Sequence, residues 1–319
     1  MRKLTSGVFQ ILGFDTRPAE SVPFPATDSQ AKWFRMLRVA FGLIWLYNVW
    51  NISSGANKHA IARFLHLPFS SAAVHLAGTG IMFVALYLAL ALISGNGMRS
   101  ALWIGTAYLL VMWIAVEHGG DFNPATGATD AGIAPPYLIA LIITYLTWRM
   151  SQRCSISADG AGNDHTKSWI YVSRLMFGFL WAWDALFKLH PYFLTHMVDF
   201  ISRAESGQPG WIIAYQRVWV AVITHTSPLC FAIITALTEA AIAWSLLSGK
   251  LLWLFLNVGL VFSLLIWSAA EGFGGPYGNG FTGTAGNMFG NAVIYALIFA
   301  YFLVLYHQPR LDKSTAQTA

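Results

Sequence analysis

Residues 72–94 read AAVHLAGTGIMFVALYLALALIS and contain no Asp, Glu, Lys or Arg. A helix of about 17 to 25 apolar residues is needed to cross roughly 30 Å of hydrocarbon, so this segment predicts a transmembrane helix. Further apolar segments follow the same pattern at residues 36–52, 101–116, 136–148, 169–189, 228–247, 251–270 and 291–307. The sequence therefore predicts an all-α integral membrane protein with eight transmembrane helices.

The composition supports this class. Hydrophobic residues make up 56% of the 319 residues and charged residues 10%, whereas soluble domains carry about 25% charged residues. A soluble enzyme, a nucleic-acid binder and a disordered chain are thereby excluded, and lipid is the expected partner. Two cysteines predict no disulfide framework, and no motif for a covalently attached cofactor is present. The first 35 residues contain no apolar stretch, so we expect no cleavable signal.

The basic residues predict the orientation. Twelve Lys and Arg residues fall in the termini and the even-numbered loops, against four in the odd-numbered loops. Because basic loops stay cytoplasmic, we expect a protein of the inner (cytoplasmic) membrane with both termini cytoplasmic. The outward loop at residues 190–227 has apolar residues at helical spacing, which predicts two short helices lying on or capping the membrane domain.

The chain also contains an internal repeat. Residues 38–48, RVAFGLIWLYN, match residues 174–184, RLMFGFLWAWD, and residues 113–120, WIAVEHGG, match residues 267–274, WSAAEGFG. Ser94-Gly95 matches Ser248-Gly249, and four residues from 140 to 145 match four from 296 to 301. Several matches in order indicate a tandem duplication. Four spans per unit make the two units parallel, related by an axis along the membrane normal.

The repeat divides the chain into five parts. Residues 1–35 form a cytoplasmic N-terminal segment, and residues 36–148 form a first, degenerate four-helix unit. A polar, Ser- and Gly-containing stretch at residues 149–168 reads as a cytoplasmic linker. Residues 169–307 form the second four-helix unit, and residues 308–319 form a cytoplasmic tail.

The second unit contains a spaced set of polar and small residues. An Arg is followed by a Gly four positions later and a Lys fourteen positions later, and the next span has a Glu followed by a Gly ten positions later. These residues are Arg174, Gly178, Lys188, Glu239 and Gly249. With the stretch IWSAAEGFGGPY at residues 266–277, the unit resembles the DoxX family of four-span membrane proteins. In the first unit Ile52 stands where Lys188 would be and Ala85 where Glu239 would be.

The resemblance implies a redox-associated membrane protein, because that family includes the DoxD subunit of thiosulfate:quinone oxidoreductase. A membrane subunit of a quinone-linked oxidoreductase is therefore one expected function. An outward-facing redox partner protein or a sulfur compound would donate electrons to the quinone. A transporter or channel for a small solute or ion, and a non-catalytic anchor or assembly protein, are the alternatives.

Ionisable residues inside the spans are the candidate site, since such residues usually face the bundle interior with a partner. Their estimated heights predict an Arg174–Glu239 pair, which either has a function or only locks two helices together. Asp184 and Lys188 lie four residues apart on one helix face. They form either a solvated interfacial pair or, with Glu271, an outward-facing pocket.

Such a pocket suits a quinone head group, because Lys188 offers a hydrogen-bond donor and the carboxyls can relay protons. Trp181 and Trp183 would supply aromatic walls for the flat ring. Seven of the nine His residues are biased toward the outer side, but none falls in a tight ligand motif. No metal site is therefore predicted.

Overall fold

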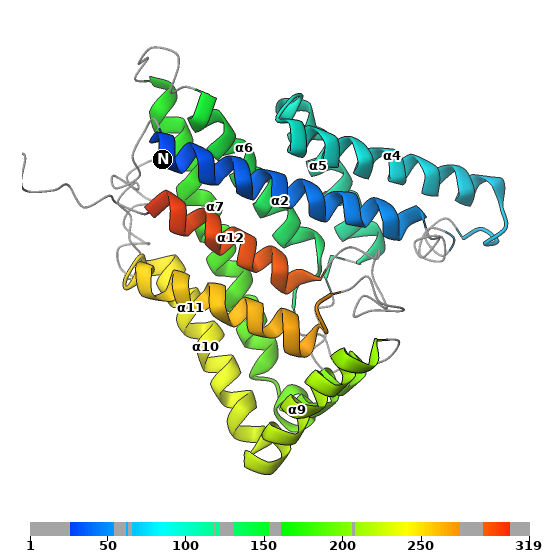
Figure 1. Cartoon of the computed structure of the whole chain (residues 1–319), viewed down its shortest axis with the longest axis vertical. Coiled ribbons are helices and arrows are strands. Elements are labelled where there is room, and N and C mark those ends of the chain that lie inside the picture. The colour runs from blue at the N-terminus through cyan, green and yellow to red at the C-terminus, as the bar shows by residue number, and fades with distance from the viewer. Residues whose placement is uncertain are drawn as a thin grey trace, which may run out of the picture.

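The structure, a computed structural model, describes residues 26–53, 62, 66–117, 119–120, 130–152, 161–205, 208–274 and 290–306. Within these ranges every regular element is a helix (Figure 1). Helices occupy all eight predicted apolar segments. They are α2 (Asp28–Ser53), α4 (Ala72–Ser94), α5 (Met98–Val111) with the π-helix η1 (Met112–Val116), α6 (Ala134–Gln152), α7 (Ala161–Lys188), α10 (Pro228–Ser248), α11 (Leu252–Leu265) with the π-helix η4 (Ile266–Ala270), and α12 (Asn291–Tyr306).

Within the described residues, four helical stretches are long and apolar enough to cross a membrane. They are Ala72–Ser94, His165–Lys188, Pro228–Ser248 and Leu252–Ala270. Met98–Ile114 and Asn291–Tyr306 are apolar but shorter. The helices thus indicate an all-helical membrane protein.

Two of the shorter helices occupy the interior of the bundle. In α12 no residue is exposed, and in α6 only Gln152 is exposed. The hydroxyl of Thr144 on α6 donates to the hydroxyl oxygen of Tyr301 on α12 at 3.0 Å. Helices that are apolar all round are typical of such central positions. The surrounding helices instead expose large apolar side chains, Leu76 and Trp50 among them, which is compatible with contact to lipid.

The longest helices pack in pairs through glycine. α2 packs against α4, and α7 packs against α10. A Cβ added at Gly42 would lie 2.7 Å from Ile93 Cγ1, and one added at Gly178 would lie 2.9 Å from Leu247. Only glycine allows the backbones to approach this closely. In both pairs the second helix ends at a glycine in the left-handed conformation, Gly95 or Gly249.

Two boundaries differ from the predicted segments. α2 begins at Asp28, eight residues before the apolar run, because Thr27 and Gln30 cap it reciprocally. In the predicted linker, α6 continues to Gln152 and α7 begins at Ala161. The intervening residues 153–160, most of the N-terminal segment and the tail at residues 308–319 lie outside the described residues.

The two short helices expected in the loop at residues 190–227 are confirmed as α8 (Pro191–Arg203) and α9 (Gly210–Thr226). Both contact α10 and η4. α8 buries Phe193 and Ile201, and α9 buries Ile212, Gln216 and Ile223. Together α8 and α9 cover the end of the bundle at which α7 ends and α12 begins.

Candidate functional site

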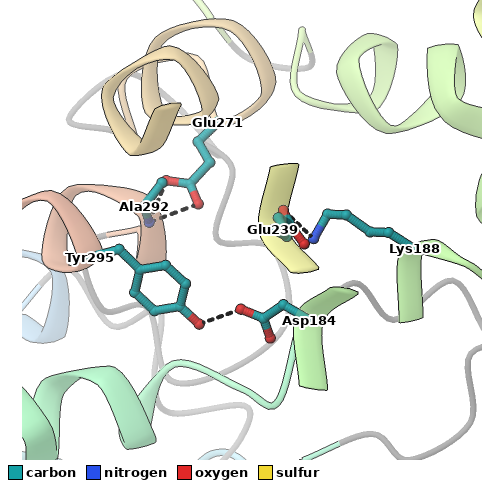
Figure 2. Close-up of polar contacts among 6 residues, drawn as sticks. All are labelled: Asp184, Lys188, Glu239, Glu271, Ala292 and Tyr295. Atoms are coloured by element: carbon teal, nitrogen blue, oxygen red, sulfur yellow. Dashed lines mark hydrogen bonds and ion pairs between the residues drawn. The ribbon is translucent and has the colours of Figure 1, made fainter. Parts of the chain in front are cut away.

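The centre of the candidate site is an ion pair between α7 and α10. The contact of Gly178 with Leu247 sets the register of these antiparallel helices. Ten residues further along α7 lies Lys188, and eight residues back along α10 lies Glu239. Lys188 Nζ is 3.0 Å from Glu239 Oε1, with side-chain exposures of 12% and 1% (Figure 2). A buried carboxylate requires such a partner.

The predicted Arg174–Glu239 pair is wrong, because Glu239 pairs with Lys188. The same register puts Arg174 beyond the last turn of α10, since α7 extends past the end of its partner. The Arg174 guanidinium instead lies 5.0 Å from the centre of the Tyr171 ring. It is 3% exposed, and its Nε and Nη2 have no hydrogen-bond partner.

Asp184 lies one turn before Lys188 and is also buried, with 1% exposure. A solvated interfacial pair is therefore excluded for these two residues. The hydroxyl of Tyr295, on α12, donates to Asp184 Oδ2 at 2.7 Å (Figure 2). The second oxygen of Asp184 and the second oxygen of Glu239, Oδ1 and Oε2, have no hydrogen-bond partner.

Glu271 follows η4 and caps α12. Its two carboxylate oxygens accept from the backbone N–H of Ala292 at 3.1 and 3.4 Å (Figure 2). Such a carboxylate satisfies a free donor of the helix N-terminus and complements the helix dipole. Burial nevertheless raises the pKa of the Glu271 carboxyl to about 8, and the hydrogen bond from Ala292 offsets only part of this shift.

The two predicted tryptophans lie on different sides of α7. Trp181 is 1% exposed, and its ring centre lies 5.1 Å from Tyr295 and 5.6 Å from Phe299. Trp183 is 36% exposed and contacts the Phe187 ring. Because residues two apart on a helix point in nearly opposite directions, Trp181 borders the site and Trp183 does not.

The site is covered at the end facing α8 and α9. Lys188 Nζ lies 5.8 Å from the centre of the Phe193 ring of α8. Asp184, Glu239 and Glu271 are all 4% exposed or less. The sequence predicts that these residues line an open outward pocket. This prediction is wrong, because the structure buries them in a polar network.

A hydrogen bond between uncharged side chains joins α2 and α6. Asn48 Nδ2 donates to the hydroxyl oxygen of Tyr137 at 3.3 Å, whereas between α7 and α12 the Tyr295 hydroxyl donates to Asp184. Ile52 and Ala85, which matched Lys188 and Glu239, are 5% and 0% exposed. The residues of α2, α4 and α6 that matched the network, Asn48, Ile52, Ala85 and Tyr137, are therefore uncharged.

The glutamates after the two π-helices have equal roles. Glu117 accepts from the backbone N–H of Ala134 at 3.2 Å with both oxygens, as Glu271 accepts from Ala292. Burial raises the pKa of the Glu117 carboxyl to about 7. Glu117 thus caps the start of α6 as Glu271 caps the start of α12.

Tyr295 is the site residue that sequence reasoning missed. The sequence match of Ala140 with Ala296 implies an offset of 156 residues. The two residues that the glutamates cap, Ala134 and Ala292, differ by 158. This second register brings Tyr137 opposite Tyr295. The signal in the sequence is a tyrosine three residues after each capped alanine. An alignment shifted by two residues does not place these two tyrosines opposite each other.

The described residues contain no group of three or more His, Cys, Asp or Glu side chains that could hold a metal ion. The chain matches no family model, no curated protein and no solved structure. The function must therefore be inferred from the geometry of the network itself.

Proposed function

We propose that this protein is the membrane subunit of a quinone-linked oxidoreductase, with its site in the set formed by α7, α10, α11 and α12. One observation carries the proposal. A buried network of Asp184, Lys188, Glu239 and Tyr295 occurs in this set, whereas the corresponding residues of the other set are neutral. Buried ionisable groups in membrane helices are costly and usually functional.

The chemistry of the network suits a quinone. Reduction of a quinone requires hydrogen-bond donors at its carbonyl oxygens and groups that deliver protons. Lys188 is one donor, the Tyr295 hydroxyl becomes a second when it turns from Asp184 to the quinone, and Asp184 and Glu239 are carboxyls that carry protons. The Trp181 ring beside Tyr295 offers a flat apolar surface for the quinone ring. Electrons would come from an outward-facing redox partner protein or from a sulfur compound such as thiosulfate.

The resemblance to the DoxX family supports the same proposal. Of the residues that carry the resemblance, Lys188 and Glu239 form the ion pair. Gly178 makes the close contact between α7 and α10, and Gly249 ends α10 in the left-handed conformation. The residues of the motif therefore lie on the two helices α7 and α10 that pack against each other, as expected if the motif maintains both this helix contact and the site.

The proposal includes a tandem duplication with eight spans and both termini in the cytoplasm of an inner-membrane protein. The glycine contacts, the π-helices and the two capping glutamates that recur in both sets support it. Reporter fusions at the C-terminus and within residues 206–210 should report opposite sides of the membrane. An outward C-terminus would contradict both the span count and the parallel repeat.

Quinone binding tests the function directly. A water-soluble, short-chain benzoquinone is titrated into the purified full-length protein. Tyr295→Phe should weaken binding about tenfold, the equivalent of roughly 1.4 kcal/mol, because it removes a donor of the site. Tyr137→Phe makes the same chemical change in the neutral set and should leave the affinity unchanged. Equal affinities in all three proteins would refute a quinone site at this network.

A transporter of a small solute or ion is the second candidate. The π-helices η1 and η4 continue α5 and α11 and end directly before the buried Glu117 and Glu271, and π-bulges are frequent at functional sites. Reconstituted vesicles that take up solute, with no bound quinone in the protein, would favour this candidate. A protein showing neither property would be an anchor or assembly factor.

A further inference from the structure

The charges of the network do not balance. Asp184 and Glu239 are two carboxyls with 1% exposure each, and Lys188 is the ammonium group that pairs with Glu239. With both carboxyls ionised, the three groups carry a net charge of −1. A net charge in a low-dielectric interior costs several kcal/mol, and such a site takes up a proton instead.

Among the described residues, no cation other than Lys188 acts on Asp184 or Glu239. Tyr295 is the polar group that α12 directs at the network, and α8 contributes the Phe193 ring. Glu271 after η4 and the half-buried Asp130 before α6 are acidic, and Asp130 acts electrostatically on Asp184 and Glu239. These groups make the potential at the network more negative.

We propose that Asp184 and Glu239 share one exchangeable proton, and that this proton exchanges with the medium through a hydrated route past Glu271, Gln208 and Gln216. The proton occupies one of the two carboxyl oxygens that lack a hydrogen-bond partner, Asp184 Oδ1 or Glu239 Oε2. The other two oxygens already accept from Tyr295 and Lys188. The proposal depends on burial and charge alone, so it stands independently of the quinone assignment.

The first part of the route follows α12. Tyr295, which donates to Asp184, lies three residues after Ala292, whose N–H donates to Glu271. Three residues of helix rise about 4.5 Å. The Asp184 and Glu271 carboxyls are therefore connected by one turn of α12, as Figure 2 shows.

The second part of the route consists of two buried amides. A Cβ added at Gly272, next to Glu271, would lie 2.8 Å from Gln208 Nε2 and 3.1 Å from Gln216 Nε2. Gln208 is 7% exposed, and neither its amide oxygen nor its amide nitrogen has a hydrogen-bond partner. Gln216 is 0% exposed, and its amide oxygen also has none. Buried polar atoms of this kind bind ordered water.

The route ends at the surface of α8 and α9. The backbone N–H of Gln208 donates to the carbonyl of Glu205, whose side chain forms an exposed ion pair with Arg217. On its other side the network is closed by aromatic rings, because Phe177 and Trp181 precede Asp184 on α7 and contact Phe299. Exchange is therefore possible from one end of the bundle and not from the other.

Infrared spectroscopy of the full-length protein in lipid nanodiscs, without added quinone, tests both parts. The wild type at neutral pH should show a carboxylic-acid band that Asp184→Asn abolishes, because that variant leaves a balanced Lys188–Glu239 pair. Signals from Glu117 and Glu271 cancel in this difference. Asn48 beside Tyr137 shows that asparagine fits such a position.

The route is tested by transfer into D2O. Replacing the amides by Gln208→Leu and Gln216→Leu together should slow the isotope shift of the Asp184-dependent band about tenfold or more, equivalent to a barrier higher by roughly 1.4 kcal/mol. Gln152→Leu, at the exposed end of α6, is the control and should leave the rate unchanged. Absence of an Asp184-dependent band would overturn the shared proton. An unchanged rate in the double amide variant would overturn the route.

Discussion

Replacing Glu239 by glutamine removes the negative partner of Lys188 and leaves an ammonium group that is only 12% exposed. At the observed 3.0 Å, the Coulomb attraction is about 5 kcal/mol for an effective dielectric constant of about 20. Loss of one partner of a buried pair costs about 3–5 kcal/mol in measured cases. We therefore expect Glu239→Gln to lower the free energy of unfolding by about 3 kcal/mol, the lower end of this range, because the glutamine oxygen still accepts a hydrogen bond from Lys188 and Asp184, one turn away, compensates part of its charge.

The matched control is the double variant Glu239→Gln with Lys188→Met. Replacing a whole buried ion pair by less polar groups is often neutral, and Ile52 and Ala85, the residues that the sequence matches to Lys188 and Glu239, are buried in α2 and α4. The double variant should regain most of the lost stability. Unfolding of the purified proteins in detergent by denaturant, followed by circular dichroism, measures both changes. A double variant as unstable as Glu239→Gln would refute the view that uncompensated charge causes the loss.

The remaining predictions concern the helix cap and the central packing. The raised pKa of Glu271 means that the folded protein holds a proton that the unfolded chain releases, so stability should fall as the pH rises from about 4.5 to about 8. Thermal unfolding across this range should show a weaker fall in Glu271→Gln, and parallel curves would contradict the assignment. Gly259→Ala would push a methyl group into the Phe299 ring and should cost about 1–3 kcal/mol. Gly80→Ala, which meets nothing within 4 Å, should stabilise by roughly 0.5–1 kcal/mol, and a similar cost for both would disprove tight packing at Gly259.

The helix positions were predictable because length and polarity decide them. Each apolar segment coincides with a helix, since an isolated backbone polar group cannot be tolerated in hydrocarbon. The early start of α2 was also readable, because Thr27 and Gln30 form the spacing of a capping box. Hydropathy alone overlooked it, since Asp28, Lys32 and Arg35 make the first turns of α2 polar.

The partners within the site were less predictable. Choosing Lys188 or Arg174 as the partner of Glu239 requires the register of α7 against α10, which the Gly178–Leu247 contact fixes. Span ends read from hydropathy place each helix along the membrane normal to within about a turn or two. Such errors in α7 and α10 together are enough to bring Arg174, about four turns from Lys188, to the height of Glu239. Sequence could identify the ionisable residues and not their pairing.

Helices α6 and α12 illustrate the same limit. The chain from Glu117 to Ala134 is four residues shorter than the chain from Glu271 to Ala292. Loops of different length hide the register of the helices that follow them. Tyr295 therefore escaped notice, although it donates the hydrogen bond that holds Asp184.

The central claim is that the charged network in the second set binds a quinone. The quinone content of full-length protein purified in mild detergent tests it most directly. The wild type and Ile52→Ala should retain quinone, whereas the folded double variant Glu239→Gln with Lys188→Met should lose it, because its network no longer has an ammonium donor or an ionisable Glu239. Equal quinone content in the wild type and the double variant would contradict the claim.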